Sequence, residues 1–152
     1  HEVVAKMTRR LDTEPFSAED RHNFAETSGK FLARIANDRD QYAIYPLSDW
    51  QSELGKIGRD LPIGSRLALL AASGSAASQL QLVTLASSSS LSAAERLEAA
   101  QKFAASVDRF GMNLGRETVT HVYDVYNSLG SNDPATAKSL GAVLDAIEAR
   151  AR

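Results

Sequence analysis

The chain has 152 residues, of which 43% are hydrophobic and 24% charged, with no cysteine and a formal net charge of −2. This composition excludes a disordered chain, a disulfide framework and a thiolate site, and it argues against a basic surface that neutralises nucleic-acid phosphates. The length fits one domain, and we expect residues 1–152 to be a single helical domain, a fragment of a longer protein because the sequence does not begin with methionine.

Helical periodicity dominates the sequence, and no run alternates as a half-buried strand does. The first apolar stripe ends before Pro15, and Ser17 then has the place and chemistry of a helix N-cap. Glu19 and Asp20 follow in the first turn, where the helix dipole favours negative charge. The residues that recur at helical spacing are Val3, Val4, Met7 and Leu11, then Phe24, Ser28, Phe31, Leu32 and Ile35.

The middle of the chain contains a capping-box pair, Ser48 and Gln51, which predicts a helix as far as Ile57. Residues 63–92 set leucines in a background of alanine, serine and glycine, and residues 71–78 have almost no side-chain bulk. Such a stretch is either a flexible linker or a closely packed segment, and the leucines that follow it favour packing.

The last third of the chain has the clearest helix signals. Ser92 with Glu95 is a second capping box, and Asp133 followed by Pro134 predicts the start of the last helix. The sequence therefore predicts an all-α bundle of about six or seven helices. The expected stripes are Leu97, Phe103, Val107, Phe110 and Leu114, ended by Gly111 and Gly115; Val119, Val122, Tyr123, Tyr126 and Leu129, ended by Gly130; and Leu140, Val143, Leu144 and Ile147, facing inward.

Familiar catalytic and metal-binding patterns do not occur. No pair of the histidines His1, His22 and His121 has metal-ligand spacing on a helix, and there is no nucleophile elbow or phosphate-binding glycine loop. His121 lies beside an apolar stripe, so we expect a partly buried structural residue. The sequence predicts no metal site, no cofactor, no nucleic-acid partner and no membrane span, since no window approaches about eighteen uninterrupted apolar residues.

Two segments carry a family resemblance. Residues 21–34 place a phenylalanine and alanine before Gly29, with Arg34 five positions after it, and residues 64–80 contain the run Gly74-Ser75-Ala76-Ala77-Ser78-Gln79-Leu80. Together they resemble the GTPase-activating domain of bacterial type III secreted effectors, the YopE, ExoS and SptP family. In that family a G-x-L-R segment supplies a catalytic arginine, and a G-G-A-A-S segment helps to form the surface that meets the GTPase.

The chain also departs from the family pattern. Arg34 arrives two positions late for G-x-L-R, so Leu32 occupies the arginine position if the register after Gly29 is kept rigid. Leu70 stands where the family has tryptophan, and the first glycine of the pair falls on Ser73 or Gly74 according to register. When residues 64–78 are laid on the family segment without a gap, the residues that coincide are Ala76, Ala77 and Ser78.

The resemblance implies a secreted bacterial effector that acts inside a host cell on a Rho-family small GTPase, with GTP and Mg²⁺ belonging to the partner. An arginine supplied in trans stabilises the charge on the phosphate oxygens, an effect worth about 10³–10⁵ in rate. We expect Arg34 to be this catalytic residue, with Arg39, Arg59 and Arg66 in reserve. The expected partner-binding residues are Gly29, Gly74, Ser75, Ala76, Ala77, Ser78 and Gln79.

A second interpretation stays open. A non-catalytic helical protein-protein interaction domain of a larger effector or adaptor, cytoplasmic if it is not secreted, fits the same residues. Arg34 is then a solvent-facing helix residue, and residues 73–78 form a face for close helix packing. The two interpretations differ in geometry, because GTPase activation requires an exposed Arg34 on the same face as residues 73–78.

Overall fold

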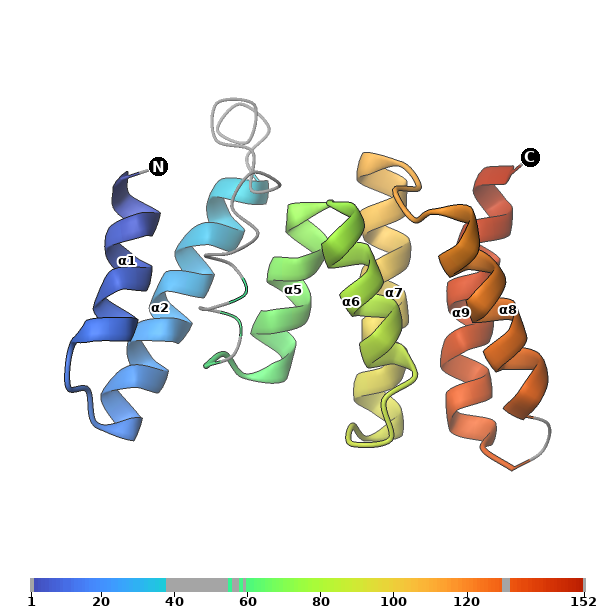
Figure 1. Ribbon diagram of the computed structural model, residues 1–152, viewed down its shortest axis with the longest axis horizontal. Coiled ribbons are helices and arrows are strands. Elements are labelled where there is room, and N and C mark those ends of the chain that lie inside the picture. The colour runs from blue at the N-terminus through green and yellow to red at the C-terminus, as the bar shows by residue number, and fades with distance from the viewer. Residues whose placement is uncertain (1, 38–54, 56–57, 59, 130–131, 152) are drawn as a thin grey trace. The chain divides into compact units, whose positions relative to one another are not determined.

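The computed structural model describes residues 2–37, 55, 58, 60–129 and 132–151 (Figure 1). Within these residues the protein consists of seven helices and contains no strand, which confirms the predicted all-α class and helix number. The chain divides into two compact units, His1–Ser73 and Gly74–Arg152, and a single domain over its whole length stays a prediction. The helix expected around Ser48 and Gln51 lies outside the described residues.

The first unit contains α1 (Glu2–Thr13), α2 (Ala18–Asn37) and α5 (Ile63–Ser73). Ser17 caps α2 as predicted, because its Oγ accepts a hydrogen bond of 3.1 Å from the Asp20 amide. The Arg10 guanidinium of α1 lies 5.2 Å from the ring centroid of Phe24, which adds a cation–π contact between α1 and α2. The core of this unit consists of Leu11, Ala25, Leu32, Leu61, Leu69 and Ala72.

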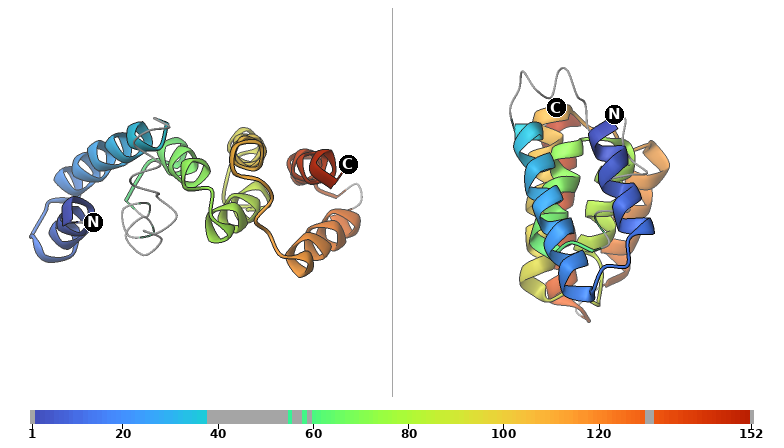
Figure 2. Two further views of the ribbon diagram at one scale, coloured as in Figure 1. Left: turned by 90° about the horizontal axis from the view of Figure 1, so that it is seen from above. Right: turned by 90° about the vertical axis from the view of Figure 1, so that its left-hand side faces the viewer.

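The second unit contains α6 (Ala76–Ala86), α7 (Ala93–Phe110), α8 (Arg116–Leu129) and α9 (Pro134–Ala151). Seen along the helix axes, α6 and α7 lie beside each other, α9 lies beside α7, and α8 packs chiefly on α9 (Figure 2). Small residues on α6 and α7 permit close approach, because they add little bulk between the helix backbones. The buried apolar residues of this unit are Leu82, Val83, Ala86, Ala99, Ala100, Phe103, Val107, Val122, Leu140, Val143, Leu144 and Ile147.

Both predicted helix starts in this unit are confirmed. The Glu95 amide donates to Ser92 Oγ at 3.3 Å and the Ser92 amide donates to Glu95 Oε2 at 2.8 Å, which closes the capping box of α7. The pKa of Glu95 is lowered chiefly by the hydrogen bond from the Ser92 hydroxyl, and further by the one from the Ser92 amide. Asp133 caps α9, where its Oδ1 accepts a hydrogen bond of 2.9 Å from the Thr136 amide.

The packed interpretation favoured for the middle of the chain holds within each unit, because α5 of the first unit and α6 of the second both bury several of their residues. Gly111 ends α7 as expected, with a φ of 81°, so the helix stops at Phe110 and does not include Leu114. In the part of the chain that the structure describes, we find no helix with the length and apolar character that crossing a membrane requires.

Gly74 is a position where the backbone requires glycine. Its φ is 66°, and a Cβ built there would overlap the ring of Phe110. Gly111 has a similar φ of 81°, but a Cβ there would meet nothing within 4 Å. The two glycines therefore separate the cost of backbone conformation from the cost of overlap.

We expect Gly111→Ala to lower the free energy of unfolding by about 1 kcal/mol, because alanine is strained in this conformation. Gly74→Ala should lower it by roughly 1–3 kcal/mol more, since the ring of Phe110 has to move. Urea denaturation followed by far-ultraviolet circular dichroism measures both. Equal losses in the two variants would show that Phe110 does not constrain Gly74.

Candidate functional site

The predicted catalytic arginine belongs to the first unit. Arg34 lies in the last turn of α2, and its side chain is exposed. Of the arginines held in reserve, Arg66 is half-buried on α5, whereas Arg39 and Arg59 lie outside the described residues. Residues 74–79 belong to the second unit, so the proximity of Arg34 to them stays a prediction.

Gly29 is buried in α2, within the first unit. A Cβ built on it would lie 2.8 Å from Leu61 Cδ2 and 3.0 Å from Leu61 Cδ1. The missing side chain therefore allows α2 to pack against Leu61, which belongs to the core of this unit. Gly29 therefore has a packing role inside the first unit, and the partner contact expected of it stays a prediction.

Residues 74–79 open the second unit, and most of them serve the start of α6. Ser75 is the N-cap of this helix, and its Oγ accepts a hydrogen bond of 3.1 Å from the Ser78 amide. Gly74 and Ser78 are both buried. Ser75 is half-buried and Ala76 and Ala77 are exposed, and partner contact through this segment stays a prediction.

Gln79 is fully buried, and both ends of its amide are hydrogen-bonded within the second unit. Its Nε2 donates to the Gly111 carbonyl at 2.9 Å, and 3.4 Å separate it from Ser106 Oγ. Its Oε1 accepts a hydrogen bond of 2.9 Å from the Asn113 amide. The side chain expected to meet a partner instead ties the start of α6 to the end of α7 and the loop that follows.

Asn113 extends this arrangement, because its Nδ2 donates to the Gly74 carbonyl at 2.7 Å. The loop after α7 is thus held against both Gly74 and Gln79. Gln79 and Ser106 are buried, whereas Gly111 and Asn113 are exposed, so the buried amide of Gln79 finds its partners in the loop at the surface. We name this set of hydrogen bonds among Gly74, Gln79, Ser106, Gly111 and Asn113 the Gln79 network.

A groove with a volume of about 190 Å³ lies between α6 and α8. On each helix the lining residues recur at positions i, i+3, i+4 and i+7, which places them along one face. Leu140 of α9 also lines the groove, because α9 packs against both α6 and α8. The α6–α8 groove is lined by Leu80, Val83 and Thr84 of α6 and its C-cap Ser87, by Thr118, His121, Val122 and Val125 of α8, and by Leu140.

The α6–α8 groove carries no Asp, Glu, Lys or Arg in its lining. Helix α6 has no charged residue over its whole length, and the charged residues of α8, Arg116, Glu117 and Asp124, are not among the lining residues. Leu80, one of the lining residues, is 44% exposed. The lining is largely apolar, and its polar groups are the hydroxyls of Thr84, Ser87 and Thr118 and the imidazole of His121.

His121 belongs to this lining. Its side chain is exposed, which corrects the expectation of a partly buried structural residue. The stripe that it accompanies includes Val122, the residue of α8 that is buried, and Val125, which is half-buried. The sequence reasoning missed this surface, although the uncharged run of residues 76–86 with its i, i+3, i+4 and i+7 pattern was a signal for it.

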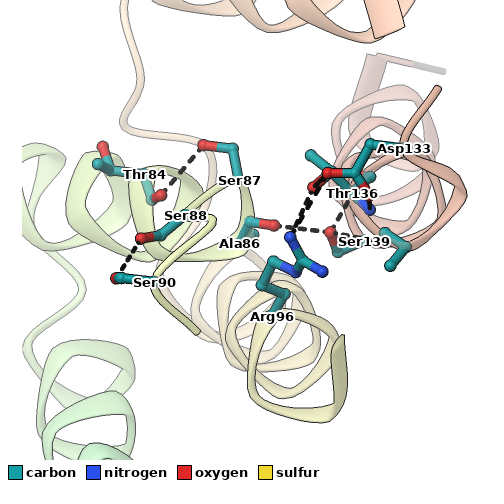
Figure 3. A network of polar contacts seen from close by, with 10 residues as sticks. Thr84, Ala86, Ser87, Ser88, Ser90, Arg96, Asp133, Thr136 and Ser139 are labelled. Atoms are coloured by element: carbon teal, nitrogen blue, oxygen red, sulfur yellow. Dashed lines mark hydrogen bonds and ion pairs between the residues drawn. The ribbon is translucent and has the colours of Figure 1, made fainter. Parts of the chain in front are cut away.

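The α6 wall of the groove is fixed at its C-terminal end (Figure 3). Ser139 of α9 is buried, and its Oγ donates to the Ala86 carbonyl at 2.6 Å. Close by, the Arg96 guanidinium of α7 donates to Thr136 Oγ1 at 2.9 Å and lies 3.5 Å from Asp133 Oδ2. The hydrogen bond from the Thr136 hydroxyl is the main reason why the pKa of Asp133 is lowered.

The α8 wall has fewer attachments. Val122 packs into the core, and Tyr123 Oη donates a hydrogen bond of 2.9 Å to Glu148 Oε1 of α9. That hydrogen bond to a carboxylate raises the pKa of Tyr123, because losing the phenolic proton would place two negative charges together. The two walls thus differ, with α6 fixed at both ends and α8 held chiefly along one side.

Among the described residues, no three His, Asp or Glu side chains are gathered so that they could hold a metal ion, and the absence of a cofactor stays a prediction. No family model, no curated protein and no solved structure matches this chain. The chemistry of the surface itself is therefore the basis for a function.

We expect Gln79→Ala to lower the free energy of unfolding by about 1–3 kcal/mol, because it leaves the Gly111 carbonyl and the Asn113 amide without their partner. The matched control is Gln81→Ala, an exposed position on the same helix, which should change stability by no more than about 0.5 kcal/mol. Hydrogen exchange at the Asn113 amide should also accelerate in Gln79→Ala. Unchanged exchange there would contradict the role assigned to the Gln79 network.

Proposed function

We propose that this chain is a helical protein-interaction domain and that the α6–α8 groove of its second unit is the binding surface. The observation that carries the proposal is the groove lining, which is largely apolar and contains no Asp, Glu, Lys or Arg, and in which Leu80 is 44% exposed. Covering the exposed part of a leucine is worth roughly 1 kcal/mol, and covering the other apolar lining residues adds to it. A side chain of a bound partner, seated in the groove, would bury this apolar surface.

A displayed library of random 16-residue peptides, panned against the whole chain, tests this proposal. We expect enriched peptides to bind the wild-type chain and the control variant Gln81→Glu equally, and to bind Leu80→Glu at least tenfold more weakly. Both substitutions add one negative charge to an exposed position of α6, but Leu80→Glu also removes an apolar side chain from the groove lining, whereas Gln81 is not a lining residue. The proposal fails if no peptide is enriched or if Leu80→Glu binds as the wild type does.

GTPase activation is a second candidate function, supported by the exposure of Arg34 in the last turn of α2. A guanidinium in solvent can enter the nucleotide site of a Rho-family GTPase, where its charge and fork of donors would stabilise the transition state. The exposed Ala76 and Ala77 would let the backbone of the second unit approach a GTPase closely. The observation against this candidate is that Arg34 lies two positions later than the arginine of the family motif.

GTP hydrolysis by Rac, Rho and Cdc42 in the presence of this chain decides between the candidates. If GTPase activation is the function, the wild-type chain and the exposed-arginine control Arg9→Ala accelerate hydrolysis, by up to about 10³–10⁵, and Arg34→Ala loses nearly all of that effect. Near-intrinsic rates with wild type and Arg34→Ala alike would remove this candidate. Acceleration that survives Arg34→Ala would keep the activity and refute the assignment of Arg34.

A further inference from the structure

We infer that α8 is a hinged arm, which leaves its place on α9 in the folded protein while α6, α7 and α9 stay packed together. The inference goes beyond the proposed function and does not rest on it, because it concerns one wall of the α6–α8 groove and not an occupant. Its support is the small buried surface of α8, the residue types of this helix, its N-terminus and the loop before it.

Helix α8 buries less of itself than the helices around it in the second unit. Among its 14 residues the buried one is Val122, and the helix packs chiefly on α9. Burial of apolar side chains is the main contribution that holds a short helix in a protein, so α8 has the least to hold it. Helix α6 is shorter, with 11 residues, and yet it buries Ser78, Gln79, Leu82, Val83 and Ala86.

The residue types of α8 add little stability of their own. Residues 118–126 are Thr, Val, Thr, His, Val, Tyr, Asp, Val and Tyr, and the helix contains no alanine. Because β-branched and aromatic side chains lose χ1 freedom in a helix, they are weaker helix formers than the alanines that recur in α6, α7 and α9. Helix α8 therefore depends on packing more than its neighbours do, and it has less of it.

The N-terminus of α8 lacks the kind of cap that the other helices of this unit have. Ser75, Ser92 and Asp133 each accept a hydrogen bond from an amide in the first turn of the helix that follows. The residue before α8 is Gly115, which has no side chain and cannot supply that bond. The start of α8 is therefore less firmly set than the starts of α6, α7 and α9.

The loop between α7 and α8 contains the pivot. Its first residues are anchored, because the Gly111 carbonyl and the Asn113 amide are both hydrogen-bonded to Gln79. Leu114 and Gly115 come next, and a Cβ built on Gly115 would meet nothing within 4 Å. Hinges are a few residues at the ends of elements that absorb a change in backbone angles, and Leu114 and Gly115 have that position.

Movement of the arm changes the α6–α8 groove. The lining residues of α8 leave with the helix, and the exposed hydrogen bond from Tyr123 Oη to Glu148 Oε1 breaks. Helix α6 keeps its place, because its bonds to Gly111, Asn113 and Ser139 do not involve α8. Elements with few buried apolar contacts and exposed hydrogen bonds are those that open first in native proteins, so the groove is complete only while α8 is docked.

Native-state hydrogen exchange of the whole ¹⁵N-labelled chain, followed by NMR at urea concentrations below the unfolding transition, tests the inference. After correction for intrinsic rates, we expect the Tyr123 amide to exchange about tenfold or more faster than the Phe103 amide of α7. Val107→Ala, in the core of α7, should accelerate exchange at Phe103 by about tenfold and leave Tyr123 unchanged. The matched variant Val122→Ala should accelerate exchange at both amides, because it destabilises the docked state from which both openings start.

A second measurement uses the absence of cysteine from the chain. The thiol of Val122→Cys should react with Ellman's reagent about tenfold or more faster than that of Val107→Cys, because both positions are buried and only the first is uncovered when α8 leaves. Cysteine is a small apolar residue close to valine in size, so these variants should keep the fold even where the alanine variants lose it.

Three results would each overturn the inference, because α8 would then open only together with the rest of the unit. They are exchange at Tyr123 as slow as at Phe103, equal acceleration of the two amides by Val107→Ala, and equal reaction rates of the two thiols. The whole chain is used, so an attachment of α8 to any other part of the protein would appear as the same slow exchange. Neither measurement involves a peptide, so the proposed function and this inference fail separately.

Discussion

The second unit depends on the two polar contacts that fix α6 at its ends. At one end the buried amide of Gln79 bonds to the Gly111 carbonyl and the Asn113 amide, and at the other Ser139 donates to the Ala86 carbonyl. An isolated helix of 11 residues is marginal in water, so tertiary contacts of this kind are what keep α6 in place. One face of α6 packs against α7 and α9, and the face next to it, which shares the buried Val83, forms the wall of the α6–α8 groove.

The helix starts were predictable because the signals that set them are local. Ser17, Ser92 and Asp133 each cap the helix that follows, and each bond runs to an amide three residues away. The end of α7 at Phe110 was less predictable, because Leu114 continues the apolar spacing, whereas the positive φ of Gly111 stops the helix. Helix starts were therefore easier to predict than this helix end, where the apolar pattern and the glycine indicate different boundaries.

The candidate site was less predictable, because small residues permit close approach without indicating what approaches. In residues 74–79 the approaching group is the chain itself, since Phe110 covers Gly74 and the polar partners of Gln79 lie 27 to 34 residues away in sequence. His121 is the opposite case, because it was expected to be partly buried and is exposed. It accompanies an apolar stripe, but that stripe faces a groove, and no pattern within α8 tells whether another helix fills the space beside it.

The unequal attachment of the two walls links the groove to the stability of the unit. Helix α6 is fixed at both ends, whereas Val122 is the buried residue of α8 and the Tyr123–Glu148 hydrogen bond is exposed. Exposed hydrogen bonds add little stability, so α8 depends on a small apolar contact with α9. A partner bound in the groove, as proposed, would contact Val125 of α8 and Leu80 of α6 and would add a second packed side to α8. Because a partner that binds only the folded state stabilises it, such binding would also stabilise the position of α8.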